Sequence, residues 1–165
     1  MEKIYCIIGA TSDIGIAYLK ELEKQNEKIK VIAIYFGDKE KLESVKNELE
    51  KENSNNKVET IIMDLSVEEN CKKLCENVKN IDILINNAGF GDCGYFTKTD
   101  IDKEMKMIKT NIVAYHILMK EYLKEMKQRG YGKILNVASI AGFMPGPLMA
   151  TYYATKAYVV RLSEA

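Results

Sequence analysis

Five short apolar runs recur along the chain, at residues 3–8, 31–36, 58–63, 81–85 and 133–138. Each run is almost continuously apolar, which is typical of strands that are buried on both faces of a parallel sheet. Between the runs lie longer stretches that have the apolar spacing of helices. The pattern therefore predicts an α/β protein, a parallel sheet covered by helices on both faces, as a single domain over residues 1–165.

Polar residues at the ends of these stretches predict where the helices begin and end. Asp38 is placed to cap a charged helix, and Ser66 and Glu69 form a capping-box pattern before the next one. Thr99 is placed to cap a long helix that Gly130 ends. The expected helices run up to residue 24, up to residue 51, and over residues 67–78, 101–128 and 151–165.

Composition restricts the classes of partner. Lys and Arg number 24, and Asp and Glu also number 24, so no excess of positive charge would attract nucleic acid or an anionic membrane. No apolar run reaches the length that crosses a bilayer, and the N-terminal run is too short for a signal peptide. We therefore expect a cytoplasmic protein that has neither nucleic acid nor a membrane as partner.

The four cysteines are predicted to be reduced thiols. Cys6 lies in an apolar run, and Cys71 and Cys75 are neighbours on one expected helix, while Cys93 stands apart. No further His or Cys pair completes a zinc-type ligand set. We therefore expect neither a disulfide nor a metal site.

A glycine turn follows the first apolar run, with Gly9 and Gly15 at its ends. Such a turn lets the backbone approach a pyrophosphate at the N-terminus of the following helix. An ordinary strand-to-helix turn uses the same glycines, so the turn indicates a nucleotide site only in combination with other motifs.

Tyr152 and Lys156 are four residues apart on the last expected helix and therefore share one of its faces. A lysine ammonium next to a phenol favours the phenolate, and such a tyrosine can exchange a proton with an alcohol or carbonyl oxygen near neutral pH. Tyr153 is three residues from Lys156 and also competes for this role.

Together these segments resemble the short-chain dehydrogenase/reductase family. The resemblance also includes Asn-Asn-Ala-Gly at residues 86–89, Asn111 in the long helix, and Ser139 thirteen residues before Tyr152. It spans the whole chain and implies a doubly wound, Rossmann-like sheet with strand order 3-2-1-4-5. It implies an NAD(P)-dependent oxidoreductase that interconverts an alcohol and a ketone or aldehyde.

The resemblance also implies a role for each site residue. Ser139 would hydrogen-bond the carbonyl oxygen, and Tyr152 would exchange the proton. Lys156 would hold the ribose and lower the pKa of the tyrosine, and Asn111, where we expect the helix to break, would position a water. The residues implied to hold NAD or NADP are Gly9, Thr11, Ser12, Ile14, Gly15, Tyr35, Phe36, Asp64, Leu65, Asn87, Ala88, Gly89, Tyr152 and Lys156.

Two positions depart from the family pattern or leave it open. Asp13 stands where the family has its middle glycine, and a carboxylate there is unfavourable for a phosphate unless it points away or caps a backbone amide. Tyr35 and Phe36 stand where an acid would favour NAD and a base NADP. Asp38 could reach a ribose and Lys39 a phosphate, so the choice between the cofactors stays open.

Family members continue past the tyrosine helix into further strands and a lid, whereas this chain ends at Ala165. We therefore expect a form that lacks those C-terminal strands and the lid, and its turnover stays open. A non-catalytic NAD(P)-binding module, truncated or sensing, is one alternative function, and a relative of the sugar-nucleotide epimerases and dehydratases is another. The resemblance also predicts a homodimer or homotetramer, formed through the long helix and the last helix.

Overall fold

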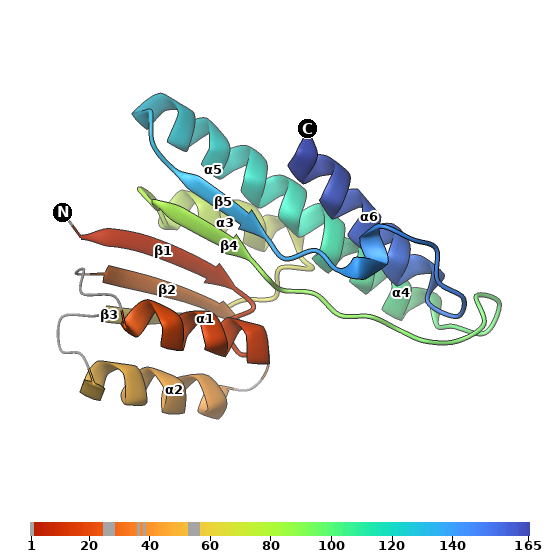
Figure 1. The fold of residues 1–165 in the computed structure, drawn as a ribbon, viewed down its shortest axis with the longest axis horizontal. Coiled ribbons are helices and arrows are strands. Elements are labelled where there is room, and N and C mark those ends of the chain that lie inside the picture. Colours follow the sequence, from red (N-terminus) through yellow and green to blue (C-terminus); the bar gives the residue numbers. More distant parts are fainter. Residues whose placement is uncertain (1, 25–28, 36, 38, 53–56) are drawn as a thin grey trace.

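Five parallel strands form one sheet in the computed structural model, which describes residues 2–24, 29–35, 37, 39–52 and 57–165. The strands are β1 (Lys3–Ile8), β2 (Ile29–Tyr35), β3 (Lys57–Ile62), β4 (Ile83–Asn86) and β5 (Lys133–Asn136). Their order is β3-β2-β1-β4-β5 (Figure 1), so the predicted doubly wound sheet is confirmed. In this topology, ligands bind outside the C-terminal ends of the strands where the order reverses, here between β1 and β4.

Helices cover both faces of the sheet (Figure 1). Helices α1 (Asp13–Glu23) and α2 (Lys39–Glu52) lie on one face, and α3 (Glu68–Asn77) and α5 (Tyr115–Arg129) lie on the other. Helix α4 (Ile101–Ile108) leads into α5 through a π-helical segment, η1 (Lys109–Ala114). Helix α6 (Ala150–Glu164) packs beside α4 and η1.

The central strand β1 is buried on both sides. Cys6 and Ile8 join the apolar core under α3 and α5, whereas Tyr5 and Ile7 join the core under α1 and α2. Successive side chains of a strand point to opposite faces. This is why the run is apolar throughout instead of alternating.

The predicted capping box before α3 is wrong. The Ser66 hydroxyl donates to Oδ1 of Asp64 at 2.6 Å, and Val67, the residue that precedes α3, makes no side-chain cap. A nearby carboxylate competes with helix N–H groups for a serine hydroxyl. Here the hydroxyl of Ser66 bonds Asp64 instead of capping the helix, so a polar pair lies at the end of β3.

The cap of α4 is Asp100, so the predicted cap at Thr99 is wrong. Oδ1 of Asp100 accepts hydrogen bonds from the backbone N–H groups of Asp102 (2.7 Å) and Lys103 (3.1 Å). At the other end of the long helical region, Gly130 takes a left-handed conformation with φ of 70° and ends α5, as predicted.

All four cysteines are free thiols, as predicted; Cys6, Cys71 and Cys75 are buried and Cys93 is exposed. Burial raises the pKa of the Cys71 thiol to about 12 and that of the Cys75 thiol to about 11, so both stay protonated and unreactive. Among the described residues, no group of three His, Cys, Asp or Glu side chains could hold a metal. The same part of the chain contains no helix that is long and apolar enough to span a membrane.

Candidate active site

Gly9 and Gly15 bring the first turn of α1 into backbone contact with the end of β1. Gly9 has φ of 79°, and a Cβ at this position would lie 2.7 Å from Cα of Ala88. A Cβ on Gly15 would lie 2.4 Å from the carbonyl oxygen of Gly9. Both positions therefore need glycine for reasons of backbone geometry alone.

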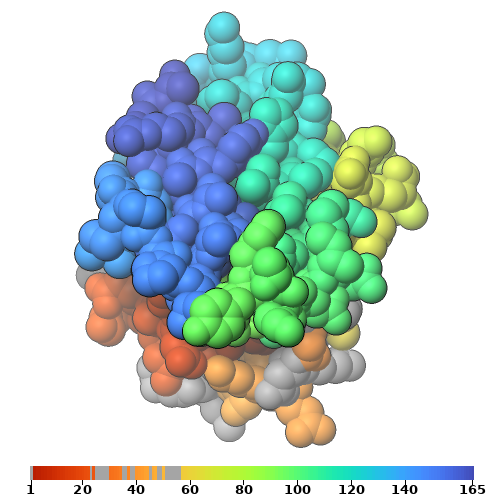
Figure 2. Space-filling view, turned by 90° about the vertical axis from the view of Figure 1, so that its right-hand side faces the viewer, coloured from red at the N-terminus to blue at the C-terminus, as the bar shows by residue number. Residues whose placement is uncertain are grey.

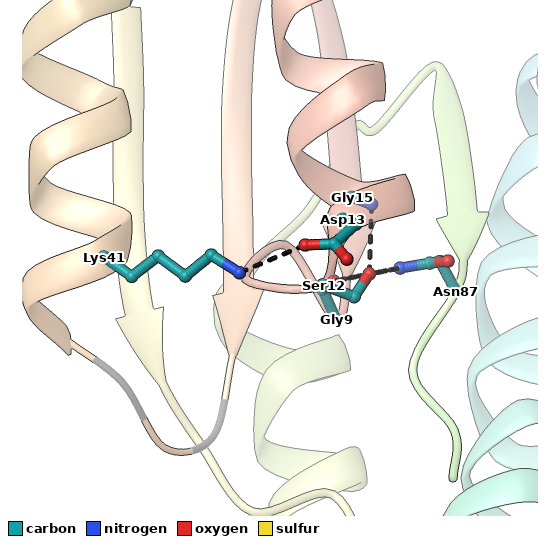
Figure 3. Close-up of polar contacts among 6 residues, drawn as sticks. All are labelled: Gly9, Ser12, Asp13, Gly15, Lys41 and Asn87. Carbon is teal, nitrogen blue, oxygen red and sulfur yellow. Dashed lines mark hydrogen bonds and ion pairs between the residues drawn. The ribbon is translucent and has the colours of Figure 1, made fainter.

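Asn87 ties this turn to the end of β4 (Figure 3). Its side-chain amide donates to the carbonyl oxygen of Gly9 (2.9 Å) and to Oγ of Ser12 (2.8 Å). Ser12 caps α1, because its Oγ accepts the backbone N–H of Gly15 at 3.0 Å. The network joins β1, β4 and α1 at the point where the strand order reverses.

The carboxylate of Asp13 points away from the turn, toward α2 (Figure 3). Its side chain is fully exposed, and Oδ1 lies 3.3 Å from the ammonium of Lys41. Solvent and Lys41 therefore screen the charge that replaces the middle glycine, although the charge stays in the first turn of α1.

A cavity of about 430 Å³ opens over the C-terminal ends of the strands, and this volume is typical of small-molecule sites. Ile34 and Met63 contribute to its apolar wall. Lys103 and Lys106 of α4 line it as well. The residues predicted to hold a cofactor that line this cavity are Gly9, Thr11, Ser12, Asp64, Leu65, Asn87, Ala88 and Gly89.

Asp64 presents an ionised carboxylate at the β3 end of the cavity. Oδ1 accepts the backbone N–H of Ser66 at 2.9 Å as well as its hydroxyl, and Oδ2 lies 3.4 Å from the ammonium of Lys106. Partial burial disfavours the charge, but the hydrogen bonds from Ser66 and the charge of Lys106 outweigh it and hold the pKa of Asp64 below its ordinary value.

Asn111 is buried inside the π-helical segment η1, where a break in the long helix was predicted. Its Nδ2 donates to the carbonyl oxygen of Phe90 (2.9 Å) and to Oγ1 of Thr155 (3.0 Å), and its Oδ1 accepts the N–H of Phe90 (3.2 Å). The helix continues in direction but changes its hydrogen bonding here, a feature frequent at functional sites. Asn111 thus holds the loop after β4 and the helix α6 together.

Tyr152 and Lys156 share one face of α6, and Nζ of Lys156 lies 5.9 Å from the centre of the Tyr152 ring. The same ammonium donates to the carbonyl oxygen of Val137 at 2.9 Å, just after β5, and lies 6.0 Å from the centre of the Tyr115 ring. Lys156 is only 5% exposed, and burial lowers its pKa. A desolvated ammonium is therefore held beside the phenol ring of Tyr152.

The loop after β4 joins these residues to the cavity. Gly89 lines the cavity, and a Cβ there would lie 3.1 Å from Oδ1 of Asn111 and 3.6 Å from Nζ of Lys156. A Cβ on Gly91 would lie 3.1 Å from the ring of Tyr152. The proposed catalytic side chains and the cavity therefore share a border at this loop.

Ser139 follows β5 and caps the short 3-10 helix η2 (Ile140–Gly142), where its Oγ accepts the N–H of Ala141 at 3.2 Å. This segment packs directly on α6, since a Cβ on Gly142 would lie 2.8 Å from the carbonyl oxygen of Lys156. The short helix that Ser139 caps therefore packs on α6 at the level of Lys156. The competing phenol, Tyr153, packs its ring on Gly146 in the loop before α6.

Two loops form an apolar rim beside these residues. The loop between β4 and α4 (green) lies against the loop between η2 and α6 (blue) in Figure 2, and the N–H of Gly94 donates to the carbonyl oxygen of Leu148 at 2.7 Å. Phe96, Phe143 and Met144 of these loops are all at least half exposed. The rim thus offers exposed apolar side chains on two loops, one of which also contacts the ring of Tyr152 at Gly91.

Three predicted cofactor residues lie outside this arrangement or cannot be placed in it. Ile14 is 51% exposed and is not among the residues that line the cavity. Tyr35 ends β2, but its side chain and that of Lys39 lie outside what the structure describes, as do Phe36 and Asp38. The residues that would choose between NAD and NADP thus stay predictions.

Other residues of this region were not singled out from the sequence. Lys103 and Lys106 line the cavity, although a lysine-rich helix face is usually a solvated one. Glu104 is buried and accepts hydrogen bonds from the hydroxyls of Thr99 and Thr151, the latter at 2.9 Å. For Glu104 the sequence held one signal, a charged residue at a position where the helical spacing predicts an apolar one.

A family model described as short chain dehydrogenase matches residues 3–165. Among curated proteins, the 3-oxoacyl-[acyl-carrier-protein] reductase FabG of Rickettsia prowazekii is 35% identical over 164 residues, which cover 99% of this chain and 64% of that protein. The very-long-chain 3-oxoacyl-CoA reductase of Mus musculus is 34% identical, over 96% of this chain and 51% of that protein. The chain thus spans between half and two thirds of the length of these relatives.

Solved structures show the same fold. A short-chain dehydrogenase from Sphingobium yanoikuyae in complex with NADPH superposes with a TM-score of 0.89 at 29% identity, over 98% of this chain and 63% of that one. The bulky-bulky ketone specific alcohol dehydrogenase from Comamonas testosteroni superposes with a TM-score of 0.88 at 28% identity, over 98% of this chain and 65% of that one.

Proposed function

This chain belongs to the short-chain dehydrogenase family, and from that premise we propose that it is an NAD(P)-dependent oxidoreductase that interconverts an alcohol and a ketone or aldehyde. One observation carries the proposal. The loop at Gly89 borders both the cavity of about 430 Å³ and the buried side chains of Asn111 and Lys156. A cofactor bound in the cavity would therefore lie against the same short segment that Lys156 and Tyr152 approach.

The residues of the cavity fit a dinucleotide. The glycine turn brings the backbone and the N-terminus of α1 to where a diphosphate would bind. The ionised Asp64 can accept a hydrogen bond from the amino group of an adenine, and Leu65 and Met63 offer apolar surface to its ring. When bound there, NAD or NADP would supply or accept the hydride.

The side chains beside the cavity have the chemistry that the other steps need. In the direction of reduction, Tyr152 would give its phenolic proton to the carbonyl oxygen, which the hydroxyl of Ser139 would also hydrogen-bond. Donors aimed at an oxygen on which negative charge develops lower the barrier. Lys156 would hold the cofactor ribose and keep a positive charge beside the phenol.

In this proposal Asn111 positions other groups and takes no direct part in the reaction. Its side chain bonds to Phe90 and Thr155, and these contacts position the loop after β4 and the helix that carries Tyr152. A relay water next to Asn111 remains a prediction.

The substrate class to test first is a 3-oxoacyl thioester. Both curated relatives described above are named as reductases of 3-oxoacyl groups. The exposed side chains of Phe143 and Met144 would contact the acyl chain of such a substrate.

Self-association is part of the same proposal. Ile108 and Ile112 of α4 and η1, together with Ala150 and Ala154 of α6, line an apolar groove of about 340 Å³. A second copy of the chain that packs α4 and α6 against the same helices would cover this groove. Sedimentation velocity should show a dimer or tetramer at micromolar concentration, and a monomer would contradict this point.

The experiment that tests the function compares Tyr152→Phe with Tyr153→Phe as its matched control. NADH or NADPH oxidation is followed with a 3-oxoacyl thioester, and cofactor binding is measured by fluorescence. We expect Tyr152→Phe to lower turnover by at least about 100-fold with little change in cofactor affinity, because it removes only the proton donor. Turnover that survives Tyr152→Phe but not Tyr153→Phe would move the role to Tyr153. Cofactor binding without turnover of any carbonyl substrate would support a non-catalytic NAD(P)-binding module.

A further inference from the structure

Tyr115 is a buried phenol next to Lys156, and the chemistry proposed above makes no use of it. It is the first residue of α5, directly after η1, and is 1% exposed. Its hydroxyl is buried and has no hydrogen-bond partner among the described residues. Within the same part of the chain, Tyr122 belongs to the apolar core under α3 and α5, whereas Tyr115 belongs to neither core. The ring of Tyr115 therefore packs outside the two cores that hold the helices on the sheet.

The ammonium of Lys156 lies near two phenol rings. Nζ is 6.0 Å from the centre of the Tyr115 ring and 5.9 Å from the centre of the Tyr152 ring. A cation over the face of an aromatic ring, within about 6 Å of its centre, is attracted by the negative charge of that face, and more strongly where water is excluded. Lys156 is buried, so both contacts are made in a desolvated site.

Few other groups compensate this buried charge. Among the described residues, the ammonium donates one hydrogen bond, to the carbonyl oxygen of Val137 at 2.9 Å, although it has three donors. The titratable groups that face it are the phenols of Tyr115, from α5, and Tyr152, from α6. Burial lowers the pKa of Lys156, and no neighbouring carboxylate raises it. The two rings are therefore the remaining partners that favour the charged form.

Tyr115 does not compete with Tyr152 as a proton donor. Burial, and after it the nearby Tyr152, raises the pKa of Tyr115, so this phenol stays neutral at the pH of ordinary turnover. What Tyr115 offers to Lys156 is therefore the face of its ring.

We propose that Tyr115 is a positioning residue whose ring holds the ammonium of Lys156 beside Tyr152 and keeps it charged. This inference rests on the function proposed above, in which a charged Lys156 acts beside the phenol. Without the ring, the buried ammonium would lose its proton at a lower pH. Reduction needs both the phenolic proton and the ammonium, so the alkaline limb of turnover would move to lower pH as well.

The test compares Tyr115→Leu with Tyr122→Leu. Both tyrosines are on α5 and 1% exposed, so each variant removes a buried ring from the same helix. The pKa of Lys156 is measured by NMR titration of lysines labelled at the ε-carbon, with Lys156→Met to assign the signal. We expect Tyr115→Leu to lower the pKa of Lys156 by about 0.5 to 1.5 pH units, and Tyr122→Leu to leave it unchanged.

Two further substitutions of Tyr115 separate the ring from the hydroxyl and from the fold. Tyr115→Phe removes only the unpartnered hydroxyl and keeps the ring, so this conservative variant should restore the pKa of Lys156. A ring-fluorinated phenylalanine in place of Tyr115 keeps the shape of phenylalanine but withdraws the negative charge from its face. It should lower the pKa of Lys156 relative to Tyr115→Phe, and it decides the question even if Tyr115→Leu does not fold.

Turnover of a 3-oxoacyl thioester provides the second measurement. In Tyr115→Leu and in the fluorinated variant, the alkaline limb of kcat should move to lower pH together with the pKa of Lys156, while KM at neutral pH stays the same. An alkaline limb that stays in place while the pKa of Lys156 falls would overturn the role in catalysis.

The other outcomes also decide. Equal effects of Tyr115→Leu and Tyr122→Leu on Lys156 would reflect a general loosening of the helix and would overturn the inference. An effect of Tyr115→Phe as large as that of Tyr115→Leu would overturn it too, since the hydroxyl and not the ring would be responsible. If the unmodified chain reduces no carbonyl substrate but the pKa of Lys156 still follows the ring, the proposed function fails, and the contact between Tyr115 and Lys156 is supported.

Discussion

Asn111 in η1 donates a hydrogen bond to the hydroxyl of Thr155 in α6, at 3.0 Å. The Thr155 hydroxyl in turn donates to the carbonyl oxygen of Tyr152 at 2.8 Å. The π-helical segment is thereby coupled to the backbone of the residue that we propose as the proton donor. Asn111 also bonds the backbone N–H and the carbonyl oxygen of Phe90. One buried amide therefore fixes the loop after β4 relative to the helix α6.

Replacing Thr155 by Val should break this coupling. The substitution keeps the shape but leaves Nδ2 of Asn111 with one partner in place of two, and we expect the free energy of unfolding to fall by about 1–3 kcal/mol. Urea denaturation measures this loss. Thr60→Val is the control, because Thr60 bonds Glu43 at 2.9 Å on the strand β3, where valine is favoured. Equal stability of both variants would show that the coupling is not important for the fold.

Gly15→Ala should destabilise the protein strongly. The added Cβ would lie 2.4 Å from the carbonyl oxygen of Gly9, a backbone atom that cannot move without opening the turn. We expect a loss of at least about 2 kcal/mol in thermal or urea unfolding, together with weaker nucleotide binding. Ala17→Ser, on the exposed side of α1, should cost only about 0.5 kcal/mol. An alanine at position 15 that unfolds like the unmodified chain would contradict the close contact.

The stability of the fold should rise with pH in the alkaline range because of Lys156. Burial lowers the pKa of this group in the folded chain, so the unfolded chain binds more protons between that lowered pKa and the unfolded value of about 10.4. The free energy of unfolding should therefore increase with pH across this window. Lys156→Met should remove this part of the pH dependence. The check is the free energy of unfolding of the variant and of the unmodified chain, measured across this pH range. Lys109→Met, at an exposed position, controls for the loss of a lysine elsewhere in the chain.

Asp64 should also make stability rise with pH, but in the acid range. Its folded pKa is lowered, so its stabilisation is complete above the unfolded value of about 3.9 and is lost as the pH falls through the lowered folded value. Asp64→Asn should therefore make acid unfolding less steep. Asp13→Asn, whose carboxylate is fully exposed, is the control. A difference curve for Asp64→Asn that is flat below pH 4 would contradict the electrostatic description of the β3 end of the cavity.

Asp13→Asn should also strengthen ADP binding at low salt. The substitution removes a negative charge from the first turn of α1, and we expect a gain of about two- to threefold, reduced by screening from Lys41 and by added salt. Asp102→Asn, in the first turn of α4, removes the same charge from another helix and serves as control. Weaker ADP binding by the Asp13 variant would mean that the carboxylate holds the turn in shape.

The sheet could be predicted from the sequence because burial on both faces leaves a pattern that needs no tertiary information. The continuous apolar run around Cys6 and Ile7 is such a pattern. The catalytic candidates could be placed because Tyr152 and Lys156 are close in sequence and on one helix.

Where a polar side chain has several possible hydrogen-bond partners nearby, the sequence could not predict which of them it bonds. The hydroxyl of Ser66 has both a helix end and Asp64 within reach, and spacing along the chain does not rank them. Lys103 and Lys106 have the pattern of a solvated helix face. Whether such a face meets a cavity depends on how α4 lies against the ends of distant strands, which local sequence does not encode.

The π-turn of η1 takes up one residue more than an α-turn. One residue rotates a regular α-helix by about 100°, so an insertion without such a turn would swing every later side chain to another side. Because the wider turn absorbs the extra residue, the buried stripe of α5, formed by Leu118, Tyr122 and Met126, keeps its direction. Deleting one residue from 109–114 would restore an ordinary α-turn, and the loss would fall on Asn111 and its contacts with Phe90 and Thr155.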